Sequence, residues 1–130
     1  MRTLNDYFIT AKIADISTAS STFVAVPDGG KIIKIFTALQ GAIGTANGAI
    51  TFELGGTAVT GGAITVTQSG SAAGDIDTAE PTALNEVSEG GSIEMITSGA
   101  PSNTIVLYVT FVIRRYLIWI MFLEHSGNIS

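Results

Sequence analysis

The sequence predicts an all-β protein built as an antiparallel β-sandwich or barrel. Apolar and polar residues alternate with a period of two along most of the chain, as in strands that bury one face. Pairs of turn-forming residues, mostly containing glycine, interrupt this alternation at short intervals. At 130 residues, with 46% hydrophobic residues, the chain has the size and composition of one domain with a substantial core. We see no internal repeat and expect a single sandwich domain.

Eight short segments carry the strand pattern. In "GAITVT", for example, Ile64 and Val66 point to one side while Thr65 and Thr67 point to the other. Turns are predicted at "VPDGGK" and at three pairs that favour hairpins, Asn47–Gly48, Gly55–Gly56 and Gly61–Gly62. The expected strands are Tyr7–Asp15, Thr22–Val26, Lys31–Leu39, Ala49–Leu54, Thr57–Thr60, Ala63–Thr67, Ser92–Thr97 and Thr104–Ile113.

The segment from Gln68 to Gly91 is rich in small and acidic residues, so we expect a long loop with a helical turn near Thr82–Asn85. Its acidic residues, Asp75, Asp77 and Glu80, form a weak candidate for a calcium site, because Ca²⁺ takes clustered oxygen ligands from loops. The spacing lacks the glycine and the distant glutamate of an EF-hand. A solvated acidic loop is the favoured interpretation, and we expect no metal.

Two strands are apolar on both faces. In Lys31–Leu39, Ile33, Ile35 and Leu39 share one face, while Ile32 and Phe36 occupy the other. In Thr104–Ile113, Tyr108 lies on a second face that is half apolar. The outer face of a sandwich is usually polar, so a second apolar face indicates a covering neighbour, which we expect to be another copy of the chain.

The most apolar stretch, "IVLYVTFVIRRYLIWIMFLE", has the length of a membrane span. Arg114 and Arg115 lie at its centre, where each costs about 3 kcal/mol, and the flanking runs are too short to span alone. We therefore divide the chain into a sandwich, residues 1–115, and an apolar extension, residues 116–130. The extension is either a final strand in a subunit interface or an arm that binds a partner. A membrane-surface anchor is disfavoured, because no basic residues follow Arg115. Tyr116, Trp119 and Phe122 are the candidate interface residues of the extension.

Composition excludes several classes of function. A net charge of -5 argues against a nucleic-acid binder, which needs a basic face. The chain has no cysteine, and its single histidine, His125, lies in a terminal segment that we expect to fray. The start of the sequence lacks the apolar core of a signal peptide, so we expect no secretion signal. We predict no catalytic residues, no cofactor and no membrane partner. A charged fraction of only 13% also indicates a component of a larger assembly.

Six motifs follow one another between Phe8 and Arg115, and a closing strand ends near the two arginines. The motifs are "ADISTASS", "VPDGGKI", "LQGAI", "GGTAVTGGAIT", "SGSAAGDID" and "PTALNEVSEGGSI". This pattern resembles that of the capsid decoration, or cement, proteins of tailed bacteriophages. The resemblance implies a jelly-roll-like sandwich without catalytic residues, assembled in the host cytoplasm. Such proteins are commonly trimers that bind the major capsid protein on the outside of the head. Residues 116–130 continue past the pattern and suggest an added arm.

Two other functions remain open at the level of the sequence. A carbohydrate- or receptor-binding module of a phage fibre or spike shares the sandwich and the long loop. It needs exposed aromatic residues or a calcium-organised loop, whereas the aromatic residues here lie mostly in strands. A small hydrolase is disfavoured, because a catalytic histidine must be held rigidly and His125 lies near the end of the chain.

Overall fold

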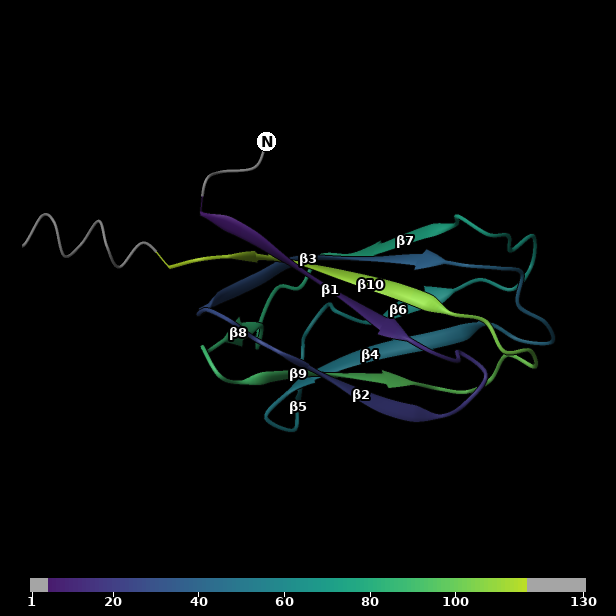
Figure 1. Ribbon diagram of the computed structural model, residues 1–130, viewed down its shortest axis with the longest axis horizontal. Helices are drawn as coiled ribbons and strands as arrows, with labels where there is room; N and C mark the ends of the chain where they lie inside the picture. The colour runs from purple at the N-terminus through teal and green to yellow at the C-terminus, as the bar shows by residue number, and fades with distance from the viewer. Residues whose placement is uncertain (1–4, 117–130) are drawn as a thin grey trace, which may run out of the picture.

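The computed structural model describes residues 5–116 and shows two antiparallel sheets packed face to face (Figure 1). Sheet A contains β1 (Asp6–Ile13), β10 (Leu107–Arg114), β3 (Gly30–Leu39), β7 (Ile76–Ala79) and β8 (Glu86–Val87). Sheet B contains β2 (Ser20–Ala25), β9 (Ser92–Thr97), β4 (Gly48–Leu54), β5 (Thr57–Ala58) and β6 (Ile64–Val66). Within this described part of the chain, no helix is long and apolar enough to cross a membrane. The predicted all-β sandwich is confirmed.

The strand order is that of a jelly roll. Sheet A has the order β1-β10-β3-β7, with β8 also paired to β3, and sheet B has the order β2-β9-β4-β5, with β6 also paired to β4. If β5 with β6 and β7 with β8 are each counted as one interrupted strand, eight positions remain, as in a double Greek key. The first and last strands pair along their full length, Asp6 with Arg114 through Ile13 with Leu107.

The predicted strands agree with the structure to within a few residues at their ends, but the predicted long loop is wrong. It contains β7 and β8, which extend sheet A beside β3. The predicted helical turn near Thr82–Asn85 is also wrong. Thr82 and Ala83 instead exchange backbone hydrogen bonds with Thr60, and Asn85 binds Ile32 through both its carbonyl and its side-chain amide. These partners are distant in sequence, so local composition could not reveal them.

Two glycine pairs predicted as hairpin turns have different outcomes. Gly55 and Gly56 join β4 to β5 with φ values of 59° and 83°, which only glycine adopts readily, so this hairpin is confirmed. Asn47–Gly48 is not a hairpin turn, because the chain there crosses from sheet A to sheet B. Gly48 is required for packing instead: a Cβ atom at this position would lie 2.8 Å from the Ile16 side chain.

The core lies between the two sheets and is almost wholly aliphatic. Its largest buried side chains include Phe52 of β4 and Phe111 of β10, whose rings meet edge-on. On one side of the sandwich β6 packs against β7, and Ile64, Val66 and Ala79 are buried there. The outward side chains of the two sheets, such as Tyr108 and Phe23, do not belong to this core.

Candidate interaction surfaces

The outer face of sheet A carries a group of apolar side chains among threonines and lysines. Cross-strand register places Tyr108 beside Ala38, and Ala38 beside Ile76, in one row. Phe36 lies in the next row, and Val112, which is only 2% exposed, lies in the row beyond. Tyr108 is 40% exposed and Ile76 57%, whereas Phe36 and Ala38 are half-buried. The predicted second apolar face therefore exists and is centred on Tyr108 and Phe36.

One predicted interface residue lies elsewhere. Ile32 is 0% exposed and belongs to the core, so the expectation that it shares an outer face with Phe36 is wrong. The reason is a β-bulge: Val112 is opposite Lys34 but Ile113 is opposite Ile32, which leaves Ile33 without a direct partner on β10. The extra residue reverses the alternation along β3 and turns Ile32 inward.

The outer face of sheet B combines an exposed aromatic ring with two carboxylates. Phe23 of β2 is 64% exposed and is opposite Glu94 of β9. Glu94 is in turn directly opposite Glu53 of β4, and both glutamates are half-buried. Ile96 occupies the next row of the same face. No local sequence pattern indicates this group, because its members come from three strands that only the sheet register brings together.

Positive charge is confined to sheet A among the described residues. Lys12, Lys31, Lys34 and Arg114 lie in its strands, and Arg115 follows directly after β10. Three of these five cations have carboxylate partners, namely Lys34 with Glu80, Arg114 with Asp6 and Arg115 with Asp28. Lys31 is opposite Glu86 in the register. The strands of sheet B carry Glu53 and Glu94 but no lysine or arginine.

The two arginines that interrupt the apolar stretch form ion pairs at one end of the sandwich. Arg114 binds Asp6 with two hydrogen bonds of 2.8 and 3.1 Å, and Arg115 binds Asp28 at 2.8 Å. The Arg115 guanidinium also lies over the ring of Tyr7, 4.7 Å from its centroid. These contacts explain why charge is tolerated in so apolar a stretch: β10 ends at Arg114, and both guanidinium groups lie at the surface.

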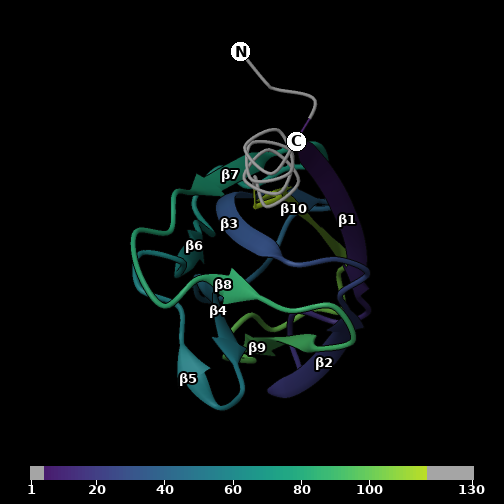
Figure 2. The same cartoon turned by 90° about the vertical axis from the view of Figure 1, so that its left-hand side faces the viewer.

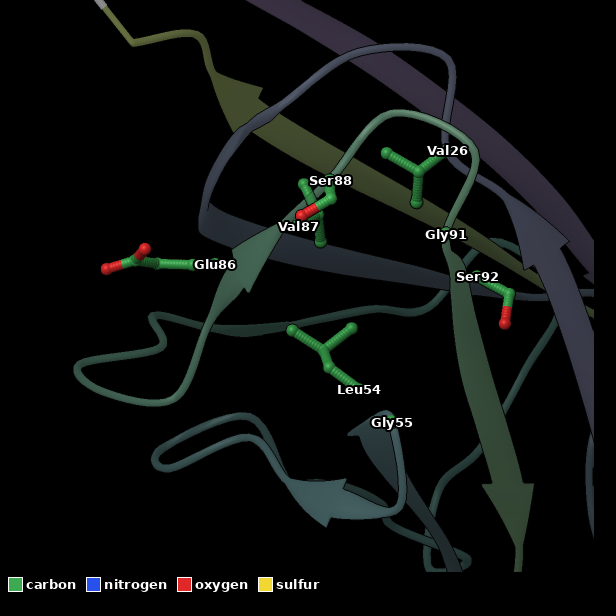
Figure 3. Close-up of a pocket in the computed structure, with 8 residues that line it drawn as sticks. All are labelled: Val26, Leu54, Gly55, Glu86, Val87, Ser88, Gly91 and Ser92. Carbon is green, nitrogen blue, oxygen red and sulfur yellow. The ribbon is translucent and has the colours of Figure 1, made fainter.

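Figure 2 shows β8 at one end of the sandwich. A groove of about 430 Å³ lies there, lined in part by Glu86 and Val87 of β8. Figure 3 shows Leu54 and Val87 on opposite sides of this groove, with the Glu86 carboxylate directed away from it. A second hollow beside it is lined by Tyr116, whose hydroxyl donates a 2.9 Å hydrogen bond to Glu86. Burial, followed by this bond to a carboxylate, raises the pKa of Tyr116. The predicted interface residue Tyr116 therefore lies at the same end of the sandwich as the groove.

The three carboxylates of the calcium candidate do not converge. Asp77 is opposite Thr37 and is partly turned towards the interior. Burial and the nearby Asp75 raise the pKa of Asp77. Glu80 instead binds Lys34, 3.6 Å away. Within residues 5–116, no group of three or more histidine, cysteine, aspartate or glutamate residues is arranged to hold a metal ion.

Several predictions fall outside the described residues. Trp119 and Phe122, the other proposed interface residues, and His125 all lie beyond Tyr116. The division of the chain at residue 115 into a sandwich and an extension also concerns this part of the sequence. These expectations stay predictions.

Comparison with solved structures finds similar folds in phage capsids. A chain in the structure described as the Cyanophage Pam1 capsid asymmetric unit has a TM-score of 0.55 and 17% identity, with 86% of each chain covered. A chain in the acidic stable capsid structure of Helicobacter pylori bacteriophage KHP30 has a TM-score of 0.53 and 11% identity, covering 82% of this chain and 85% of that one. The likeness establishes the fold.

A carbohydrate-binding module, CsCBM6-3 from Clostridium stercorarium in complex with cellobiose, is also similar. Its TM-score is 0.48 at 17% identity, with 88% of this chain and 84% of that chain covered. A score at this level does not establish a shared fold. No protein-family model matches the sequence, and no curated protein matches it.

Proposed function

We propose that this chain is a non-enzymatic structural protein of a tailed-phage virion, a decoration protein that binds the outside of the head as a trimer. The observation that carries the proposal is the apolar outer face of sheet A, on which Tyr108 and Ile76 are exposed. Large apolar side chains that are exposed on one face are typical of sites of protein association. The fold shared with chains in the Pam1 and KHP30 capsid structures directs the proposal to phage heads.

The proposed mechanism is multivalent attachment. A trimer presents three copies of each binding patch, so that after the first contact with the major capsid protein the others form at high effective concentration. Modest patches on each subunit then suffice to hold neighbouring capsomers together. The low charged fraction suits such a role, because surface that is buried in an assembly does not need solubilising charges.

The decisive experiment uses heads from a phage that lacks the gene for this chain. Purified protein is added to these heads, and binding is measured by co-sedimentation and electron microscopy. The proposal predicts saturable binding at symmetry-related sites on the outer surface and a higher temperature of DNA release. Heads that bind no protein and release DNA at an unchanged temperature contradict it.

A substitution at the centre of the apolar face tests its role. Tyr108→Glu places a charge there, and we expect the protein to become monomeric and to lose head binding. Ser69→Glu makes the same change in net charge at an exposed site in the connection between β6 and β7, so it is the matched control. Light scattering on a sizing column gives the mass of each variant. An unchanged mass for Tyr108→Glu contradicts a role of this face in trimer formation.

The C-terminal extension has two proposed roles that a truncation separates. A chain that ends at Arg115 is compared with the full chain for mass and for head binding. Weaker association identifies residues 116–130 as an intersubunit clasp, whereas an intact trimer that no longer binds heads identifies them as an anchor to the shell. A truncated chain that matches the full chain in both properties contradicts both roles. The carbohydrate-binding alternative stays a prediction, to be tested by calcium and oligosaccharide titration.

A further inference from the structure

Glu53 and Glu94 form a pair of like charges that has no ion-pair partner within residues 5–116. They are directly opposite each other in the antiparallel register of β4 and β9, both half-buried. Side chains opposite each other in such a register have Cβ atoms about 4.5–5.5 Å apart, and like charges at that distance destabilise the sheet. No lysine or arginine lies in the strands of sheet B.

The surroundings of the pair are those of an interface rather than of open solvent. Phe23, opposite Glu94, is 64% exposed and is the most exposed of the large apolar side chains in the described residues. Ile96 is half-buried in the adjacent row. A ring and an aliphatic side chain beside two carboxylates favour a partner that presents a cation next to an apolar group.

Sheet A carries that combination at one corner of its outer face. Lys12 is exposed and is directly opposite Tyr108. Among the described residues Lys12 has no carboxylate partner, in contrast to Lys34, Arg114 and Arg115. An unpaired cation beside an exposed tyrosine thus complements an unneutralised carboxylate pair beside an exposed phenylalanine, and the two sets lie on opposite outer faces of one chain.

We infer that the outer face of sheet B in one copy binds the Lys12–Tyr108 corner of sheet A in the next copy. The Lys12 ammonium lies between the carboxylates of Glu53 and Glu94, and Tyr108 packs beside Phe23. This contact joins two different surfaces, so it is heterologous and closes into a ring if the rotation between subunits permits. The inference rests on the self-association in the proposed function and assigns the two surfaces that perform it.

Glu53→Lys separates association from folding. A lysine opposite Glu94 replaces a repulsive cross-strand pair by an attractive one, so we expect an unchanged or higher melting temperature. It also replaces one of the two carboxylates that bind Lys12 by a cation that repels it, so we expect the dissociation constant for self-association to rise at least tenfold. Glu89→Lys, in the exposed turn before β9, changes the net charge equally and serves as the control, with no expected effect on association. Self-association of Glu53→Lys at the wild-type level overturns the inference.

A charge exchange between two variants tests the pairing directly. Lys12→Glu alone and the double variant Glu53→Lys/Glu94→Lys alone are each expected to be monomeric, because their two faces carry the same charge. Mixed together, each supplies the complement of the other, and we expect heterodimers or larger species by light scattering. A mixture no heavier than its components overturns the inference. Suppose that the separate variants and their mixture behave as predicted but wild-type protein binds no heads. The proposed function is then wrong, whereas the inferred contact between copies is supported.

Discussion

The ring of Phe52 meets the ring of Phe111 edge-on across the interior, with centroids 5.4 Å apart and an angle of 86° between the planes. Phe52 belongs to β4 of sheet B and Phe111 to β10 of sheet A, so this contact joins the two layers. Both rings are essentially inaccessible to solvent. An edge-to-face pair of this geometry adds about 0.5–1.5 kcal/mol to the stabilisation from burial.

Phe111→Ala should therefore be among the most destabilising substitutions in the core. We expect it to lower the free energy of unfolding by about 3–5 kcal/mol, because it leaves a cavity between the sheets. Urea denaturation followed by circular dichroism measures the effect. Leu84→Ala, which shortens a side chain that is 59% exposed and that the proposed contact between copies does not use, is the control and should change the stability by less than about 0.5 kcal/mol. Equal losses for both variants contradict the placement of the core.

Two buried threonines should respond to valine in opposite directions. Thr37 is 1% exposed, and its hydroxyl has no hydrogen-bond partner among the described residues. Thr97 is also buried, but its hydroxyl donates to the Thr18 carbonyl and accepts from the Ser20 amide. We expect Thr37→Val to stabilise the fold by about 1 kcal/mol and Thr97→Val to destabilise it by about 1–3 kcal/mol. The melting temperatures of the two variants test this prediction. A lower melting temperature for Thr37→Val contradicts it and shows that the Thr37 hydroxyl has a hydrogen-bond partner.

Removing the Arg114 side chain should weaken the pairing between β1 and β10. The side chain of Asp6 is 1% exposed, so Arg114→Gln leaves a buried carboxylate without its guanidinium. We expect the midpoint of the unfolding transition to fall for Arg114→Gln, and to fall further than for a substitution in an exposed ion pair. Arg115→Gln is the control, because Asp28 is half exposed and an exposed ion pair contributes less than about 1 kcal/mol. Denaturant titration of both variants tests the difference, and a larger loss for Arg115→Gln contradicts it.

Asp77 should make the protein less stable at neutral pH than at mildly acidic pH. Because burial and Asp75 raise its pKa in the folded state, the ionised form opposes folding, and this penalty disappears as the pH falls through the raised value. Asp77→Asn should therefore raise the melting temperature at neutral pH. The gain should shrink towards zero at lower pH, where the wild-type carboxyl is protonated in both states. A gain that is independent of pH contradicts this electrostatic origin.

The candidate surfaces were only partly predictable. Tyr108 and Phe36 were identified because each lies in a strand with apolar residues on both faces, a pattern that is visible locally. Ile32 was misplaced because one bulge residue in β3 reverses the alternation, and nothing in the local sequence marks a bulge between apolar residues. The pairing of Glu53 with Glu94 depends on the register between β4 and β9, whose residues are about forty positions apart in the chain.

By itself, the sequence determined the fold class, most of the strands and the presence of surplus apolar surface. These properties depend on the two-residue period and on turn residues, which act over a few positions. The tertiary structure decided the jelly-roll order, the short strands β7 and β8, and which charges have partners. Those features depend on hydrogen bonds and ion pairs between distant segments, such as Ile32 with Asn85 and Arg114 with Asp6. Such contacts join residues that are far apart in the sequence, so no local sequence pattern predicts them.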